Sequence, residues 1–286
     1  FNCPESILAP LKAIGFDLLT TANNHALDRG WQGVISTIRF LKSYGFYHTG
    51  TFLSEEDYNK PLVVDIKGIK LCFIAETYHA NGLEKVFKGK MKHYGVKYIR
   101  NSNQKKDVQK CRSAGADKVV FSIHWGNEYM RYPMTMVKNL EKRYIKAGAD
   151  IIIGSHPHFV QPFRVQNVKT GNNSTKKVVT AWSMGNFISG MRAQYADTGM
   201  ILYIDIRKNL KTGKVSIGKL SWVPTWVDRD GEVGGKREYR VIPVGRFLFD
   251  SELFSTLKPT SQVRLKQVWQ ESLEVPGITH GLPLVE

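Results

Sequence analysis

Four short segments of the sequence carry side chains that could hold a metal ion or transfer a proton. Imidazole is a good ligand for zinc, iron, copper and nickel, whereas carboxylate and amide oxygens suit harder ions. A metal-bound water becomes a hydroxide near neutral pH, and the ion polarises a phosphoryl or acyl oxygen. The candidate side chains are Asn23, Asn24, His25, Asp28, His124, Trp125, Glu128, His156, His158 and Asn186. These residue types predict a polar site with metal-binding or acid–base chemistry.

Each of the four segments follows a run of apolar residues that we interpret as a β-strand. These strands are expected at residues 16–22, 118–123, 151–153 and 178–182. In open α/β sheets the ligand site lies outside the carboxyl ends of the strands. Four of the 8 histidines follow such ends. We therefore expect the four loops to bring their imidazoles and amides into one pocket.

The sequence His156-Pro157-His158 requires a bent loop, because the two imidazoles alternate around the proline. Pro157 stiffens this loop, and Gly154 permits a tight turn before it. Only a bent loop would let both histidines converge on one ion.

Each candidate residue also has a purely structural interpretation. A single histidine after a strand is often a hydrogen-bonded cap, and Trp125 is expected to pack beside the site. Asp28 could begin the next helix, where a carboxylate complements the helix dipole. Glu128 could be a surface acid, and Asn186 could hold a turn through its side chain. These alternatives leave open a noncatalytic protein whose histidines are structural.

Predicted helices and strands alternate around these segments. Apolar residues at helical spacing predict helices, and short apolar runs predict strands. The helices are expected at 32–44, 105–114, 134–147 and 260–273, and the further strands at 62–66, 69–75, 200–206 and 214–220. This order favours a layered α/β sandwich with a mixed β-sheet, in a single domain over residues 1–286. Residues 228–286 are expected to form a less regular C-terminal extension.

The charge balance favours an anionic partner. Lysine and arginine number 41 against 25 acidic residues, which gives a net charge of +16. A field of this sign attracts nucleic acid, anionic lipid or a polyanionic polymer. Because the sequence contains no recognised DNA-binding motif, nucleic acid is the least favoured of the three.

Cysteines and chain ends add little to the functional assignment. The 3 cysteines lack the short spacing of a zinc knuckle or a disulfide framework, and Cys72 lies in an apolar run that predicts a core residue. No apolar run reaches the length of about 20 residues that a membrane-spanning helix needs. The sequence begins at Phe1 rather than at Met, so we expect an N-terminally incomplete chain that lacks a leader or anchor.

The four segments resemble the CapA (also PgsA) family of poly-γ-glutamate capsule biosynthesis proteins. The resemblance covers residues 7–206 and rests on four motifs in the family's order. These motifs are Ala22-Asn23-Asn24-His25-Ala26-Leu27-Asp28-Arg29-Gly30, His124-Trp125-Gly126-Asn127-Glu128-Tyr129, Gly154-Ser155-His156-Pro157-His158-Phe159-Val160-Gln161 and Ser183-Met184-Gly185-Asn186-Phe187. The four motifs are specific together, whereas any one of them would be weak alone.

The resemblance implies a fold similar to calcineurin-like metallophosphoesterases, which are layered α/β sandwiches around a two-metal site. By this resemblance Asn24 would be a metal ligand and His25 a proton donor. His124, His156 and His158 would then bind a divalent metal such as Mn, Zn or Fe. The family's Gly-Asp and Glu-containing segments have no counterpart in this sequence, so the acidic bridging ligands are missing. This departure from the family's pattern argues against a full two-metal centre and leaves open a single ion held by the three histidines.

Three functions remain as hypotheses. The leading one is an extracytoplasmic, membrane-associated or cell-surface capsule protein that binds poly-γ-glutamate or a phosphorylated substrate, beside the capsule-synthesis membrane machinery. In an active form His25 would be the general acid, and Glu128 would assist proton transfer or orient a ligand. The second is a metal-dependent phosphoesterase or related hydrolase, and the third is a noncatalytic polyanion-binding protein. The sequence does not decide whether the chain is an enzyme.

Overall fold

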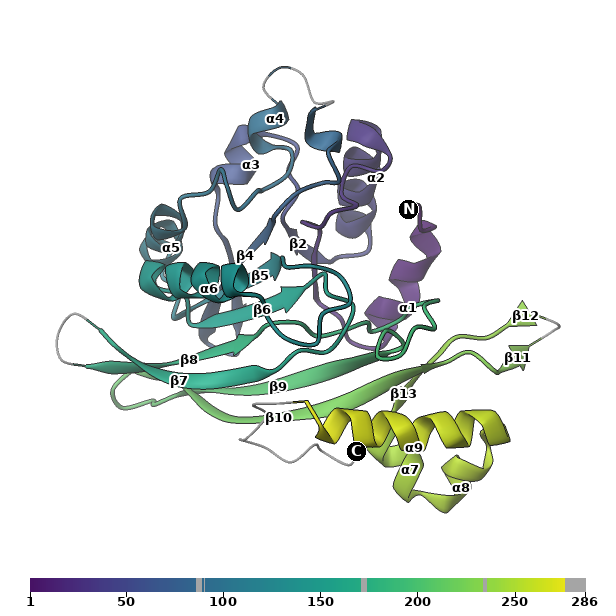
Figure 1. The fold of residues 1–286 in the computed structure, drawn as a ribbon. Coiled ribbons are helices and arrows are strands. Elements are labelled where there is room, and N and C mark those ends of the chain that lie inside the picture. The colour runs from purple at the N-terminus through teal and green to yellow at the C-terminus, as the bar shows by residue number, and fades with distance from the viewer. Residues whose placement is uncertain (86–88, 90, 171–173, 234–235, 276–286) are drawn as a thin grey trace. The chain divides into compact units, whose positions relative to one another are not determined.

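The structure is a computed structural model that describes residues 1–85, 89, 91–170, 174–233 and 236–275 (Figure 1). The chain divides into two compact units. The first unit comprises residues 1–125 and 139–152, and the second comprises residues 126–138 and 153–286. The single domain expected over residues 1–286 stays a prediction.

The first unit alternates helices and strands, as the sequence predicted. Its helices are α1 (Leu8–Ala13), α2 (Gly30–Ser43), α3 (Glu55–Asn59), α4 (Met91–Tyr94), α5 (Gln104–Ser113) and α6 (Thr135–Ala147), which enters this unit at residue 139. Its strands are β1 (Leu18–Thr20), β2 (Tyr47–Thr49), β3 (Leu62–Ile66), β4 (Ile69–Thr77), β5 (Lys118–His124) and the first two residues of β6 (Ile151–Ser155). Short 3₁₀ turns lie at Glu5–Ile7 and Leu83–Lys85.

The sheet of the first unit is mixed. β3 and β4 form the expected antiparallel hairpin, and Lys67 and Gly68 between them have φ angles of 54° and 81°. Positive φ at both turn residues suits the twist of a two-residue hairpin. β4 runs parallel to β5, so that Thr77 lies opposite His124. β1 pairs with β2 in a separate two-stranded sheet. The sequence had suggested that the strand before His25 belongs to the same sheet as the other three, and the structure differs from this expectation.

Helix α2 packs an apolar stripe inward, and α5 is attached covalently to a strand. α2 buries Val34, Ile38 and Leu41, at the helical spacing that predicted it. α5 is joined to β4 by a Cys72–Cys111 disulfide, although the cysteine spacing had suggested none. The two cysteines lie 39 residues apart in the sequence, so only the packing of a helix on a strand brings them together.

The second unit contains long antiparallel strands and a helical C-terminal part. Its elements are β7 (Phe163–Lys169), β8 (Thr175–Ala181), β9 (Thr198–Lys208), β10 (Val215–Asp228), β11 (Glu232–Val233), β12 (Lys236–Arg237), β13 (Arg240–Pro243), α7 (Val244–Phe249), α8 (Ser251–Ser255) and α9 (Pro259–Leu273). β10 pairs with β9 on one side and with β13 on the other, while β7 and β8 form a hairpin.

Helix α9 packs on the β10–β13 strands through a buried apolar cluster (Figure 1). The cluster includes Trp226, Ile242, Leu265 and Val268, and its helical members lie three residues apart on one face of α9. The predicted helix at 260–273 is therefore confirmed, and the described residues after 228 are more regular than we expected. Residues 276–286 of the expected extension lie outside the described part. Within that part, no helix has the length and apolar character needed to cross a bilayer.

Candidate functional site

The predicted site residues fall into two groups, one in each unit. The first, called the His25 group, consists of Asn23, Asn24, His25, Asp28 and His124. The second, called the His158 group, consists of Glu128, His156, His158 and Asn186.

A compact turn after β1 positions the first residues of the His25 group. The Asn23 side chain accepts a hydrogen bond from the backbone N–H of His25 at 2.8 Å. The His25 carbonyl then accepts the Asp28 N–H at 3.2 Å, and the buried Leu27 anchors the turn in the core. A short polar side chain is well suited to such local bonds. The turn therefore fixes the backbone of both potential proton-transfer residues.

His25 and Asp28 form a hydrogen-bonded pair. The His25 Nδ1 and the Asp28 Oδ2 lie 2.8 Å apart, and the carboxylate also contacts the Phe1 ammonium. Burial raises the pKa of Asp28, but its hydrogen bonds to Phe1 and His25 outweigh burial and hold the pKa below its usual value. An ionised carboxylate accepts the Nδ1 proton, which leaves Nε2 as the other proton-exchanging atom of the imidazole.

His25 also borders a cavity of the first unit. This cavity has a volume of about 630 Å³ and is lined by residues of the N-terminal segment, of the His25 turn and of α2. Its polar lining includes Asn23, Arg29, Gln32 and Thr37. A small anionic group could therefore reach the histidine beside a guanidinium.

Asn24 and His124 meet although they are 100 residues apart in the sequence. The Asn24 Oδ1 lies 2.9 Å from the His124 Nε2, and the Asn24 amide nitrogen donates to Asn81 Oδ1 at 3.4 Å. This orientation makes the Asn24 oxygen an acceptor, so the Nε2 atom of His124 carries the proton. The structure thus brings together two of the predicted ligands. Trp125 is fully buried with its ring 6.1 Å from that of Tyr144, as expected of a packing residue.

In the second unit, His158 lies between Asn186 and Glu128. The His158 Nδ1 lies 3.0 Å from the Asn186 Oδ1, and its Nε2 lies 3.9 Å from the Glu128 Oε1. The Asn186 amide nitrogen donates to the Ala196 carbonyl at 2.7 Å, which directs the amide oxygen toward His158. His158 therefore carries its proton on Nδ1, and its Nε2 faces the carboxylate side.

The backbone around the His158 group adopts unusual conformations. Of the six non-glycine residues with positive φ in the described part of the chain, four are Tyr129, His156, His158 and Tyr195, with φ between 61° and 103°. Such conformations are costly for residues with a Cβ and tend to cluster at functional sites. The His156 and His158 rings lie 6.5 Å apart, and Tyr129 stacks on His158 at 5.7 Å. The predicted bend around Pro157 is therefore present.

Glycines hold Asn186 in place. A Cβ atom on Gly185 would lie 2.5 Å from the Thr198 carbonyl oxygen, and φ of Gly185 is +68°. A Cβ atom on Gly199 would lie 2.5 Å from the Asn186 carbonyl oxygen. Only glycine permits this close approach of the two backbones. Both glycines therefore help to present the Asn186 side chain to His158.

A buried carboxyl group beside β5 escaped the sequence reasoning. Glu76 is fully buried in β4, where its Oε2 accepts hydrogen bonds from Tyr144 at 2.5 Å and from Gln104 at 3.1 Å. Burial raises the pKa of Glu76, although these hydrogen bonds and the charge of Lys97 oppose the shift. The sequence does contain a signal for it, since Glu76 is an acid that directly follows the apolar run 71–75 within β4.

The positions of the possible ligand atoms indicate whether the predicted residues could hold a metal ion. Among the described residues, no group of three or more His, Cys, Asp and Glu side chains could hold a metal ion. The Asn24 oxygen and the His124 Nε2 are bonded to each other, so neither offers an open ligand position in this arrangement. The donors of the described residues do not fit a metal centre as they stand, and the predicted metal site stays a prediction.

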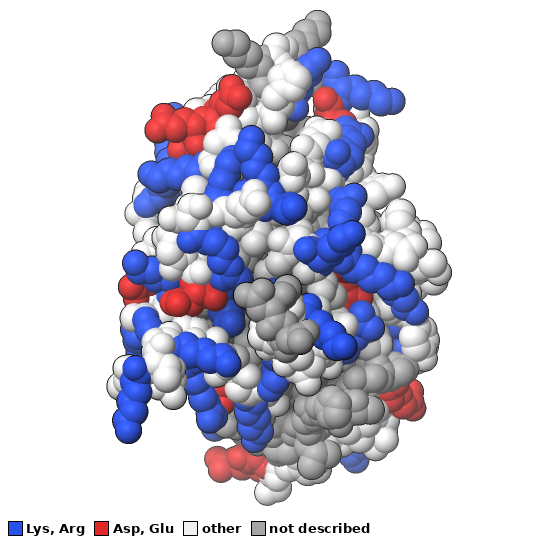
Figure 2. All heavy atoms as spheres, turned by 90° about the vertical axis from the view of Figure 1, so that its left-hand side faces the viewer, with Lys and Arg blue, Asp and Glu red and all other residues white. Residues whose placement is uncertain are grey.

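Helices α5 and α6 present a basic face on the first unit. Its exposed cations are Lys105, Lys106, Arg112, Lys142, Arg143 and Lys146. In Figure 2, which views the side where α5 and α6 lie in Figure 1, blue side chains predominate over red. The acids of this region are engaged: Asp107 pairs with Lys97 at 2.9 Å and Asp150 pairs with Arg112 at 2.5 Å. The face therefore presents a cluster of positive charge to the solvent.

Comparisons with known proteins agree on one family. The family model described as "Bacterial capsule synthesis protein PGA_cap" matches residues 1–191. "Capsule biosynthesis protein CapA" of Bacillus anthracis is 29% identical over 190 residues, which are 65% of this chain and 43% of that protein. "PGA biosynthesis protein CapA" of Bacillus subtilis (strain 168) is 29% identical over 209 residues, 72% of this chain and 51% of that protein. The chain thus spans about half the length of the curated relatives it matches.

One solved structure is similar at a lower level. It is the crystal structure of a hypothetical protein from Thermus thermophilus, which is 14% identical and superposes with a TM-score of 0.39. The match covers 81% of this chain and 78% of that protein's chain. A similarity of this size carries no argument about function.

Proposed function

Because the chain belongs to the PGA_cap family of bacterial capsule synthesis proteins, we propose that it binds the anionic polymer of a capsule on the α5–α6 basic face. Its mixed α/β fold agrees with the metallophosphoesterase-like fold of the family. The polymer that suits this chemistry is poly-γ-glutamate, which bears one carboxylate per residue at neutral pH. The whole protein's role in capsule synthesis is part of the same proposal.

The main support for the proposal is that the lysines of α5 and α6 are exposed, whereas the nearby acids are paired or buried. Lys105, Lys106, Lys142 and Lys146 are exposed, and among the described residues none of them forms an ion pair with an acid. Asp107 and Asp150 are held in ion pairs, and Glu141 is fully buried. A surface with cations outside and acids inside attracts a flexible chain of carboxylates, and added salt screens that attraction.

The His25 and His158 groups are proposed to provide acid–base chemistry for this polymer or its precursors. His25 would donate a proton from Nε2, because Asp28 holds its Nδ1 proton and stabilises the imidazolium. In the second unit Glu128 would orient a ligand or assist proton transfer at the His158 Nε2. Asn186 holds His158 in the tautomer that this role needs.

Location outside the cytoplasm is also proposed. A capsule is assembled at the cell surface, so a capsule synthesis protein would work at the membrane or beyond it. The Cys72–Cys111 disulfide supports this location, because disulfides persist in oxidising compartments and are rare in the cytosol.

Charge reversal on the basic face tests polymer binding. The affinity for fluorescent poly-γ-glutamate is measured by anisotropy for a variant with Lys105, Lys106, Lys142 and Lys146 changed to Glu. We expect a loss of affinity of about a hundredfold and a weaker dependence on salt. The control changes Lys208, Lys211, Lys214 and Lys219 of the β9–β10 hairpin to Glu, which alters the net charge equally. Equal losses in the two variants would show that only the overall charge matters and would overturn the proposed face.

A separate assay addresses catalysis and metal binding. The purified protein is analysed for metal content and then assayed with a phosphodiester substrate in the presence of added manganese. Bound Mn, Zn or Fe that is lost in the His158→Ala variant would support His158 as a metal ligand, and the variants Asn24→Ala, His124→Ala and His156→Ala test the other predicted ligands in the same way. Turnover that this variant abolishes would favour the phosphoesterase alternative over a capsule role without hydrolysis.

A further inference from the structure

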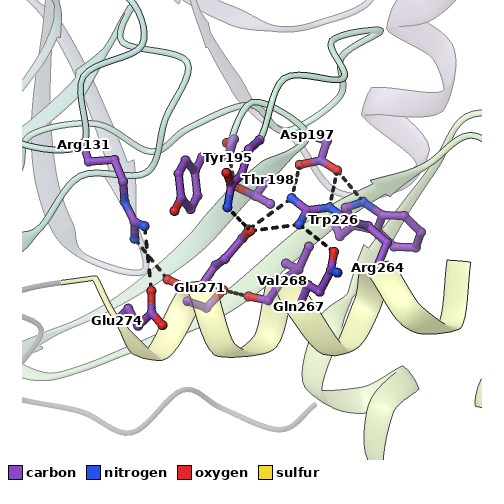
Figure 3. Close-up of polar contacts among 12 residues, drawn as sticks. Arg131, Tyr195, Asp197, Thr198, Trp226, Arg264, Gln267, Val268, Glu271 and Glu274 are labelled. Carbon is purple, nitrogen blue, oxygen red and sulfur yellow. Dashed lines mark hydrogen bonds and ion pairs between the residues drawn. The ribbon is translucent and has the colours of Figure 1, made fainter.

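Arg264 of α9 forms a dense polar network in the second unit (Figure 3). Its Nε and Nη2 donate to the two carboxylate oxygens of Asp197 at 3.0 and 2.8 Å. Its Nη1 and Nη2 donate to the two oxygens of Glu271 at 2.9 and 3.0 Å. Such bidentate ion pairs fix the orientation of the guanidinium as well as neutralising its charge. Burial lowers the pKa of Arg264, but these hydrogen bonds outweigh it and raise the pKa overall.

Asp197 is held from two further directions. The Trp226 indole nitrogen donates to its Oδ2 at 2.9 Å, and the Val227 N–H donates to its backbone carbonyl at 2.9 Å. The side chain is only 13% exposed. Its main attachment to α9 is the Arg264 guanidinium, so this guanidinium fixes the start of β9 against the C-terminal helix (Figure 3).

The residue before Asp197 orients the His158 group. The Ala196 carbonyl accepts the Asn186 side-chain amide at 2.7 Å, and the Asn186 oxygen faces the His158 Nδ1 at 3.0 Å. Because Ala196 and Asp197 share a peptide bond, the carbonyl that accepts the Asn186 amide is bonded directly to the Asp197 backbone, whose carboxylate Arg264 holds. The chain of contacts from Arg264 to His158 is therefore continuous.

Aromatic contacts reinforce the same path. The Arg131 guanidinium lies 3.9 Å from the Tyr195 ring and donates to the Glu271 carbonyl at 3.2 Å. The Tyr195 ring contacts Phe159 with centroids 5.5 Å apart, next to His158 in the sequence. The Gln194 amide adds a hydrogen bond to Glu271 at 3.1 Å. The segment before β9 is thus attached to α9 at several points.

We propose that Arg264 is a positioning residue that sets the orientation and tautomer of His158 through Asp197 and Asn186. Helix α9 lies outside residues 1–191, which the family model matches, so this control comes from a part of the chain beyond the shared region. The functional meaning of this inference rests on the proposed role of His158. The experiment that tests the inference is independent of that role, because it requires neither polymer nor catalysis.

The test uses the imidazole signals of the full-length, ¹⁵N-labelled protein. Arg264→Met is expected to shift His158 from the Nδ1–H form toward a mixture of tautomers and to speed amide exchange in residues 189–197 about tenfold. Arg264→Lys keeps the charge but not the two-pronged geometry, so it is expected to restore the signal only in part. Lys266→Met removes an exposed cation from the same helix and should leave His158 unchanged.

The amide signals of the β7–β8 hairpin in the second unit report whether that unit is folded in each variant. If Arg264→Met unfolds the protein, Asp197→Asn provides the second test, because it weakens the same contact with a smaller change. A folded variant of either kind with the wild-type His158 spectrum would overturn the proposal. Loss of polymer binding in the α5–α6 variant has no bearing on this result, so the two proposals can fail separately.

Discussion

The imidazole of His158 donates its Nδ1 proton to the side-chain oxygen of Asn186, across 3.0 Å. The Asn186 amide cannot reverse its orientation without losing the 2.7 Å hydrogen bond to Ala196. His158 also has a φ of 61°, a costly backbone conformation for a residue with a Cβ atom.

We first predict that neutral His158 is found almost entirely in the Nδ1–H form. Asn186→Ala removes the acceptor, so the fraction of the Nε2–H form should rise to that of a free imidazole. Long-range ¹H–¹⁵N correlation spectra above pH 8 measure the two forms directly. Identical spectra for the wild-type protein and the variant would contradict the hydrogen bond described here.

Gly185→Ala is predicted to be much more harmful than Gly213→Ala. Both glycines have φ near +70°, which costs a residue with a Cβ about 1 kcal/mol. At Gly185 the new Cβ would also meet the Thr198 oxygen at 2.5 Å, whereas at Gly213 it would meet nothing within 4 Å. Urea unfolding should show an additional loss of about 2 kcal/mol for Gly185→Ala. Equal losses of stability in the two variants would mean that the backbone at Gly185 moves away from the Thr198 carbonyl at little cost.

The Glu76→Gln variant is predicted to become more stable relative to the wild-type protein as the pH rises. The pKa of Glu76 is raised in the folded state, so its contribution to stability is present below the ordinary pKa of 4.5 and is lost as pH rises through the folded value. Glutamine has no such dependence. The difference in unfolding free energy between variant and wild type should therefore increase as the pH rises above 4.5.

Chemical unfolding at several pH values measures this difference. The control is Glu56→Gln on the exposed face of α3, for which we expect no comparable trend. A difference for Glu76→Gln that is independent of pH would show that Glu76 ionises in the folded protein as freely as in the unfolded chain.

Reduction of the Cys72–Cys111 disulfide is predicted to destabilise the first unit. A bridge across 39 residues restricts the unfolded chain by about 4 kcal/mol on the chain-entropy estimate. The Cys72→Ala/Cys111→Ala variant should lose a similar amount, while Cys3→Ser, at an exposed free cysteine, should lose none. Thiol titration of the unreduced, unfolded protein should find one thiol. Three reactive thiols would show that the bridge is absent.

Local sequence patterns were sufficient for most of the elements that carry the site. The 62–66 and 69–75 runs with Lys-Gly between them define a hairpin by their own turn geometry, and the apolar spacing of α2 and α9 defines two helices. The four motifs also identified the family, which the comparison confirms over residues 1–191. These features depend on neighbours within a few residues, so a sequence can reveal them.

Only the tertiary structure decided which side chains meet. Asn24 contacts His124 across 100 residues of sequence, Arg264 contacts Asp197 across 67, and Cys72 joins Cys111 across 39. No local propensity encodes such pairs, because each depends on how whole elements pack and on the register of β4 with β5. The sequence alone therefore supplied the candidate residues and the fold class, whereas packing decided their hydrogen-bond partners, the tautomer of His158 and the burial of Glu76.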